Sequence, residues 1–252
     1  MKFSDWAAKC TRIAVFLWFV LNGGIAIAQP LDNFSKDDFI SQLLDQHVQA
    51  TNDIDKFNLS RALYLIYRFE SIEKSIEFIS LTLEHAKNLD DPTRLIYAHT
   101  ELGAAYSELG DYRRAFEEYS NAFTIVSLSG ISSEVYHTNY HLGKTYLDIQ
   151  LPNLAQDLIQ SAFENYDNDR SRWMPLYQLA SLNLEIGDVV SANQIIVQLS
   201  DLLNRLNDDD DIGNLHYSIL LAGLYQKTGR IELAETLLNQ IEAPLNKASL
   251  PF

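Results

Sequence analysis

The chain has 252 residues, of which 47% are hydrophobic and 21% are charged, a composition typical of a folded globular protein. Its formal net charge of −15 makes the surface strongly acidic. Such a surface repels phosphate groups, which excludes nucleic acids and anionic membrane surfaces as expected partners.

Residues 1–28 have the three-part layout of a secretory signal peptide. Three basic residues precede the uninterrupted apolar run Ile13–Leu21, and Ala26–Ala28 offers a site for cleavage after Ala28. The apolar run is shorter than the roughly 20 residues that a spanning helix needs, so we expect cleavage; the alternative is an uncleaved membrane anchor. The mature chain is then periplasmic or secreted. It lacks Cys10, the one cysteine, so disulfides cannot stabilise it.

The segment after the leader, residues 29–56, is predicted to hold a capping helix. Apolar residues recur within Phe34–Ala50 at the spacing of an amphipathic helix. The residues expected on its buried face are Phe39, Ile40, Leu43, Leu44 and Val48.

One segment in the middle of the chain, Leu95–Val126, has the pattern of two antiparallel helices joined by a tight turn. Gly103 is small and lets the first helix approach the second closely. Gly110-Asp111 is expected to end the first helix and cap the second. Small and aromatic residues then alternate along the pair, at positions Tyr106, Ala115, Tyr119 and Ala122.

The same pattern recurs towards the carboxyl terminus. The small residues of the successive first helices are Gly103, Gly143, Ala180 and Ala222, separated by 40, 37 and 42 residues. A degenerate copy precedes them, so the predicted array covers residues 57–246 and leaves a tail of residues 247–252. Asp91-Pro92 and Met174-Pro175 are predicted to begin helices, because proline is tolerated in the first turn.

These motifs resemble the tetratricopeptide repeat, whose repeats are about 34 residues long and therefore shorter than those here. The resemblance implies an all-α fold, a right-handed superhelix of antiparallel helix pairs. It also implies a binding scaffold and not an enzyme. The longer repeats are similar to those of exported bacterial members, among them the periplasmic sensory regions of membrane-bound diguanylate cyclases, an architectural analogy only.

In that family the first helix of each repeat lines a concave groove, which locates the candidate binding residues here. Tyrosine and histidine, which combine apolar area with hydrogen bonding, dominate the set. The predicted lining of the groove is Arg61, Tyr64, Arg68, Tyr97, Glu101, His137, Tyr140, His141, Lys144, Tyr177 and Gln178. The bland alternative is that several of these rings pack between helices as core.

The sequence contains few candidates for catalytic or metal-binding residues. No nucleophile elbow, phosphate-binding loop or dinucleotide fingerprint is present, so we predict no catalytic residues and no cofactor. His137 and His141 share a helix face and could bind a transition metal, but the sequence offers no obvious third ligand. His99 and His216, on neighbouring first helices, are the candidates for a third ligand. The preferred interpretation is two polar groove residues and no metal.

Two functions remain open from sequence. The first is a periplasmic scaffold that binds a segment of another protein in signalling or envelope assembly. The alternative is a receptor for a small ligand or peptide signal in the Tyr/His-lined groove. A homodimer through the terminal helices is also plausible, because the last helix carries a run of apolar residues, Leu233, Leu237, Leu238 and Ile241.

Overall fold

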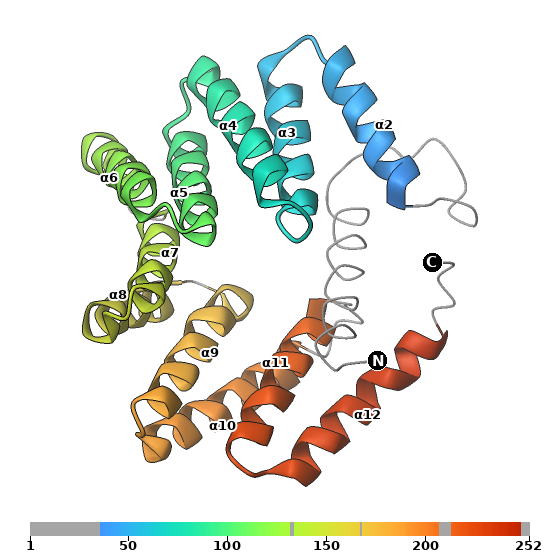
Figure 1. Cartoon of the computed structure of the whole chain (residues 1–252), viewed down its shortest axis with the longest axis vertical. Coiled ribbons are helices and arrows are strands. Elements are labelled where there is room, and N and C mark those ends of the chain that lie inside the picture. Colours follow the sequence, from blue (N-terminus) through green and yellow to red (C-terminus); the bar gives the residue numbers. More distant parts are fainter. Residues whose placement is uncertain (1–35, 132–133, 167, 207–212, 248–252) are drawn as a thin grey trace. The chain divides into compact units, whose positions relative to one another are not determined.

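The computed structural model describes residues 36–131, 134–166, 168–206 and 213–247, which fold into helices and contain no strand. The all-α prediction is confirmed. The helices are α2 (Lys36–Gln49), α3 (Asp53–Tyr67), α4 (Ile72–Leu89), α5 (Pro92–Leu109), α6 (Tyr112–Ser129), α7 (Val135–Asp148), α8 (Pro152–Asn165), α9 (Asp169–Glu185), α10 (Val189–Leu206), α11 (Gly213–Lys227) and α12 (Ile231–Lys247) (Figure 1).

The described residues form two compact units, which divide between Ser161 and Ala162. The predicted leader, residues 1–28, lies outside the described residues. Within the described part of the chain, no helix has both the length and the apolar character that crossing a membrane requires.

Helix α2 lies within the segment that is predicted to hold a capping helix. Phe39, Ile40 and Leu43 are buried as expected, but Val48 is 82% exposed because it lies in the last turn, where the helix ends at Gln49. The predicted boundary between residues 56 and 57 falls inside α3. That helix begins at Asp53, where the side chain of Asn52 accepts a hydrogen bond from the amide of Asp55.

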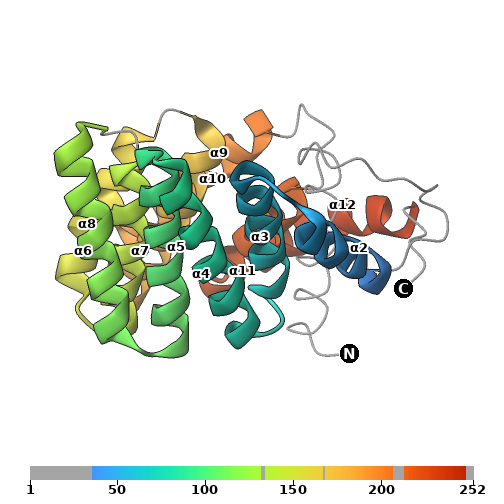
Figure 2. The ribbon, with the colours of Figure 1, turned by 90° about the horizontal axis from the view of Figure 1, so that it is seen from above.

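The first unit consists of helix hairpins whose members pack closely. In Figure 2, α3 pairs with α4 and α5 with α6. A Cβ atom on Gly103 would lie 2.7 Å from Cε1 of Tyr119, and one on Gly143 would lie 2.6 Å from Cγ1 of Ile159. The predicted reason for these glycines is therefore confirmed: only glycine allows the helices to cross at this distance.

The turns also follow the predicted chemistry. Gly110 ends α5 with a φ of 84°, which glycine adopts without strain, and Asp111 caps α6 by accepting a hydrogen bond from the amide of Arg114. Pro92 begins α5 as predicted. Pro175 does not begin a helix: α9 starts earlier, because Asn168 caps it by accepting from the amide of Ser171.

The second unit has its own apolar core around Trp173 of α9, whose side chain is fully buried. Its indole ring stacks on Tyr217 of α11 with ring centres 4.5 Å apart and on Tyr177 with centres 5.7 Å apart. In α12, Leu237 and Leu238 pack against this core, whereas Leu233 is 50% exposed. The terminal apolar face is thus partly used within the unit, and the dimer stays a prediction.

Candidate functional site

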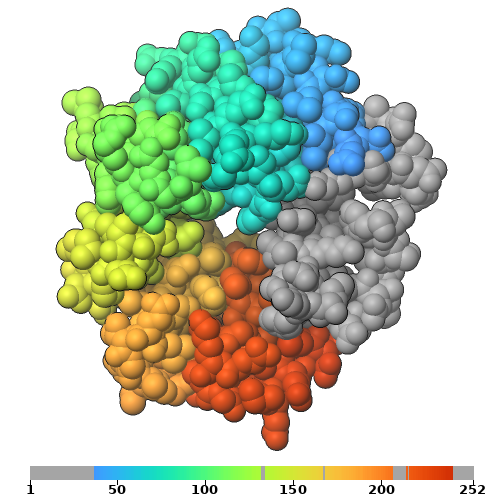
Figure 3. All heavy atoms as spheres, in the orientation of Figure 1, coloured from blue at the N-terminus to red at the C-terminus, as the bar shows by residue number. Residues whose placement is uncertain are grey.

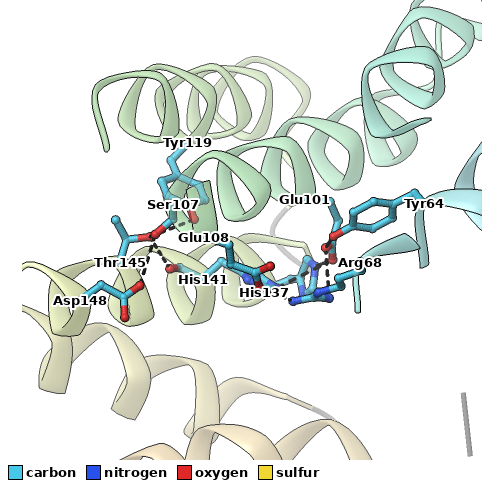
Figure 4. A network of polar contacts seen from close by, with 10 residues as sticks. All are labelled: Tyr64, Arg68, Glu101, Ser107, Glu108, Tyr119, His137, His141, Thr145 and Asp148. Atoms are coloured by element: carbon cyan, nitrogen blue, oxygen red, sulfur yellow. Dashed lines mark hydrogen bonds and ion pairs between the residues drawn. The ribbon is translucent and has the colours of Figure 1, made fainter. Parts of the chain in front are cut away.

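A buried carboxylate, Glu101 of α5, forms the centre of a polar cluster in the first unit (Figure 4). Only 4% of its side-chain surface is exposed. The hydroxyl of Tyr64 donates a hydrogen bond to Oε2, and Nη1 of Arg68 lies 3.6 Å from the same oxygen. Oε1 faces α7, where Nε2 of His137 lies 2.8 Å away and Nε2 of His141 lies 3.8 Å away. We call these five residues the Glu101 cluster.

The neighbours of Glu101 decide its charge. Burial alone would raise the pKa of this carboxyl, but the charge of His141, the hydrogen bond from His137 and the charge of Arg68 together hold it well below its usual value. Burial lowers the pKa of the His141 imidazole well below its ordinary value, against the opposing effect of Glu101. Burial likewise raises the pKa of the Tyr64 hydroxyl. At neutral pH the cluster therefore holds an ionised carboxylate and a protonated phenol.

A second group of side chains runs across the three first helices beside this cluster. The guanidinium carbon of Arg61 on α3 lies 4.9 Å above the ring centre of Tyr97 on α5. Tyr97 in turn stacks on His137 of α7, with ring centres 6.1 Å apart and planes inclined by 8°. All three side chains are half-buried, so part of each reaches solvent. We call Arg61, Tyr97 and His137 the stacked row.

Buried hydroxyl pairs fix α7 against α5 and thereby set the geometry of the site. The Oγ1 atoms of Thr100 and Thr138 are 2.8 Å apart, next to Glu101 and His137. Two helical turns further on, Thr145 donates to Ser107 over 2.9 Å, and the hydroxyl of Tyr119 lies 3.1 Å from the same threonine hydroxyl. Because each buried hydroxyl has a partner, displacing either helix along its axis would leave polar groups unsatisfied.

The predicted groove residues fall into two sets. Arg68 is the C-cap residue directly after α3. Eight others belong to α3, α5 and α7: Arg61, Tyr64, Tyr97, Glu101, His137, Tyr140, His141 and Lys144. Within this set Tyr64 and Tyr140 are buried, and the ring of Tyr140 contacts that of His141 with centres 5.1 Å apart. The other two, Tyr177 and Gln178, belong to α9 in the second unit. Tyr177 packs against the Trp173 core, as the bland alternative for a single tyrosine expected.

Sequence reasoning missed two features of the cluster. Glu108 follows Glu101 by two turns of α5, and its Oε1 lies 3.5 Å from Nη2 of Arg68. Glu101 was expected in the groove but not as the partner of both histidines, which are 36 and 40 residues away. His99, the residue expected to approach the histidine pair, instead contacts Glu118 of α6, with Nδ1 2.6 Å from the carboxylate. His216 belongs to the second unit.

The second unit carries a shallow pocket of about 230 Å³ between α9 and α10. Charged residues line its rim, where Nε of Arg205 lies 2.8 Å from Asp169. Both side chains of this ion pair are largely exposed, so it contributes little to stability or to discrimination between ligands. The Glu101 cluster, whose central carboxylate is buried and hydrogen-bonded to Tyr64 and His137, is the stronger candidate site.

This chain is similar to known proteins in its fold and not in its sequence. No protein-family model and no curated protein matches it. Among solved structures, BtubC (BKLC) from P. vanneervenii is similar with a TM-score of 0.60 and 18% identity over 87% of this chain and 95% of that one. NprR in complex with its cognate peptide NprX gives a TM-score of 0.60 with 13% identity, over 95% of this chain and 67% of that one.

A third similar structure contains the nearly identical TPR-like repeats of a Podosopora anserina protein assigned as a kinesin light chain. Its TM-score is 0.51 and its identity is 18%, over 84% of this chain and 99% of that one. At these identities the likeness concerns the fold alone. The chain has the fold of a TPR-like helical repeat protein.

Proposed function

We propose that this chain, which has the fold of TPR-like repeat proteins, is a scaffold that binds a segment of another polypeptide on the inner side chains of α3, α5 and α7. The stacked row carries the proposal. Arg61, Tyr97 and His137 come from three successive first helices, and each is half-buried with one face in contact with the next. A ligand that contacts all three side chains must reach across α3, α5 and α7, as an extended peptide segment does.

The chemistry of the row suits a peptide. Tyrosine and arginine dominate the energetics of many protein interfaces, because they offer a large contact area and hydrogen bonding with little loss of entropy. Here the neighbouring rings and guanidinium already order one another, which lowers the entropic cost of binding. The similarity to NprR, whose structure contains a bound peptide, supports the same use of the fold here.

A double substitution in the row tests the proposal. Arg61→Met with Tyr97→Leu keeps apolar volume but removes the cation and the ring, and it leaves His137 in place. We expect it to weaken partner binding by about 2 kcal/mol or more, as loss of interface hot spots does. The measurement is capture of a partner from an envelope extract, followed by a binding titration with overlapping peptides of the captured protein.

The matched control is Arg113→Met on α6, which removes an exposed arginine whose salt bridge is to Glu117, one turn away in the same helix. It should bind like the wild type. If the row variant retains full affinity while its helical circular dichroism is unchanged, the row is not the recognition surface.

The alternative function is a receptor for a small ligand or peptide signal. The Glu101 cluster favours it, because buried ionisable groups with strongly shifted pKa values gather at ligand sites. Overlapping peptides distinguish the two functions. Binding of a peptide of several residues whose affinity depends on Arg61 and Tyr97 supports the scaffold, whereas saturable binding of a small metabolite that excludes peptides supports the receptor.

The proposal includes export, with action in a periplasmic signalling or envelope-assembly pathway. It rests on the leader-like residues 1–28. When the chain is expressed in a Gram-negative host, it should appear in the periplasmic fraction. Its intact mass should match a chain whose first residue is Gln29. A chain that starts at Met1 in the membrane fraction would indicate a retained anchor, and an unprocessed chain in the cytoplasm would contradict export.

A further inference from the structure

We propose that Glu101, His137 and His141 form a binding site for a divalent transition-metal ion, zinc in the first instance. One carboxylate oxygen and one ring nitrogen of each histidine all lie within 4.8 Å of one another. Within the described part of the chain, this is the one group of three histidine, cysteine or acidic side chains with such geometry. The proposal does not depend on the function proposed above.

The distances fit a tetrahedral ion. Zinc bonds of about 2.0–2.1 Å to nitrogen and oxygen place two ligand atoms about 3.3–3.4 Å apart. In the structure Oε1 of Glu101 lies 2.8 Å from Nε2 of His137 and 3.8 Å from Nε2 of His141, values on either side of that separation. Shifts of about half an ångström would bring Oε1 to the zinc-ligand separation from both nitrogens. The ring nitrogens of the two histidines lie within 4.8 Å of each other, so the imidazoles would close around the ion as it binds. Two imidazoles and one carboxylate are a donor set that zinc accepts with one coordination position left open.

The residues around the three ligands hold them in place, as outer-shell partners of metal sites do. Tyr64 and Arg68 both contact Oε2 of Glu101, which leaves Oε1 turned towards the histidines. His137 is stacked on Tyr97, and His141 makes edge contacts with His137 and Tyr140. The ligands are thus largely preorganised before a metal arrives.

The charges around the three ligands also suit a metal. Two cations, Arg68 and Lys144, face the cluster and oppose a dication, whereas Glu101 and Glu108 favour it. The surrounding charge is therefore nearly balanced, and the donor set decides which ion binds.

The experiment is a titration of the full, untagged chain with Zn²⁺ and with Co²⁺ in excess Mg²⁺. Mg²⁺ prefers oxygen ligands and occupies exposed carboxylates, so it suppresses binding elsewhere on this acidic surface. We expect one equivalent of Zn²⁺ by calorimetry and a tetrahedral visible spectrum with Co²⁺. Glu101→Gln and His137→Gln should each weaken Zn²⁺ binding more than about 100-fold, and Tyr64→Phe about 10–100-fold.

The matched control is His99→Gln, which removes another largely buried histidine that contacts a carboxylate but that belongs to no group of three potential ligands in the described part of the chain. It should bind Zn²⁺ like the wild type. X-ray absorption of the zinc-loaded wild type needs no variant to fold and should show two imidazole ligands. Absence of one-equivalent binding, undiminished binding by His137→Gln, or a shell of oxygen atoms alone would overturn the proposal.

Discussion

Glu101→Leu is expected to destabilise the chain by about 3–5 kcal/mol, although leucine has a similar volume and the position is almost completely buried. The loss arises from the groups that Glu101 now satisfies. Without the carboxylate, the buried hydroxyl of Tyr64 loses its acceptor and Arg68 loses one of its two acidic partners. Urea unfolding of the metal-free chain, followed by far-ultraviolet circular dichroism, measures the change.

Two further variants separate this cause from a simple packing defect. Glu101→Gln keeps an acceptor oxygen and loses only the charge, so it should cost less, about 1–3 kcal/mol. Adding Tyr64→Phe and Arg68→Met to Glu101→Leu removes the stranded polar groups, so the triple variant should be more stable than the sum of the single effects predicts. Strict additivity, or a cost of Glu101→Leu below about 1 kcal/mol, would show that these side chains do not depend on one another.

Trp173→Ala is expected to lower the free energy of unfolding of the second unit by about 3–5 kcal/mol. The side chain is fully buried and stacks on rings of both α9 and α11, so its removal leaves a cavity at the centre of that core. The measurement is the shift of the urea midpoint with an unchanged slope.

Trp173→Phe is the informative companion to this variant. The indole Nε1 is buried and has no hydrogen-bond partner among the described groups, so losing the N–H sacrifices no bond. The phenylalanine variant should therefore cost less than about 1.5 kcal/mol. As a control in the same unit, Val190→Ala on the exposed face of α10 should change stability by less than about 0.5 kcal/mol. An alanine variant as stable as the wild type would contradict the assignment of Trp173 as the centre of the core.

The helix pairs are predictable from the sequence because helix crossings and tight turns each require particular residues. The space-filling view shows α3, α4 and α5 as a continuous packed mass (Figure 3). Close packing of this kind requires small residues where helices cross. Gly103 and Ala115 are such residues in α5 and α6, and Gly143 and Ala155 are such residues in α7 and α8. Gly110 and Asp111 mark the turn between two helices. These are local requirements, so each leaves a local signature.

Two predictions were wrong where capping contacts, and not the spacing of residues, set the end of a helix. Pro175 was expected to begin a helix, but Asn168 supplies a cap two turns earlier and the helix continues through the proline. Val48 fits the apolar spacing of α2, yet the helix ends before its neighbours can cover that residue. In both cases the boundary of the helix, which depends on capping contacts, overruled the periodicity.

The sequence by itself determined the helical class, the paired repeats and the set of first-helix residues from which the site is drawn, because periodicity, small crossing residues and turn caps are encoded within each repeat. Only the tertiary structure decided which of those residues meet. Glu101 joins Tyr64, His137 and His141 across three repeats, at separations of 36 to 40 residues, while Tyr177 enters a separate core. That outcome depends on how neighbouring helices stack and on side-chain directions, which no spacing within one repeat specifies.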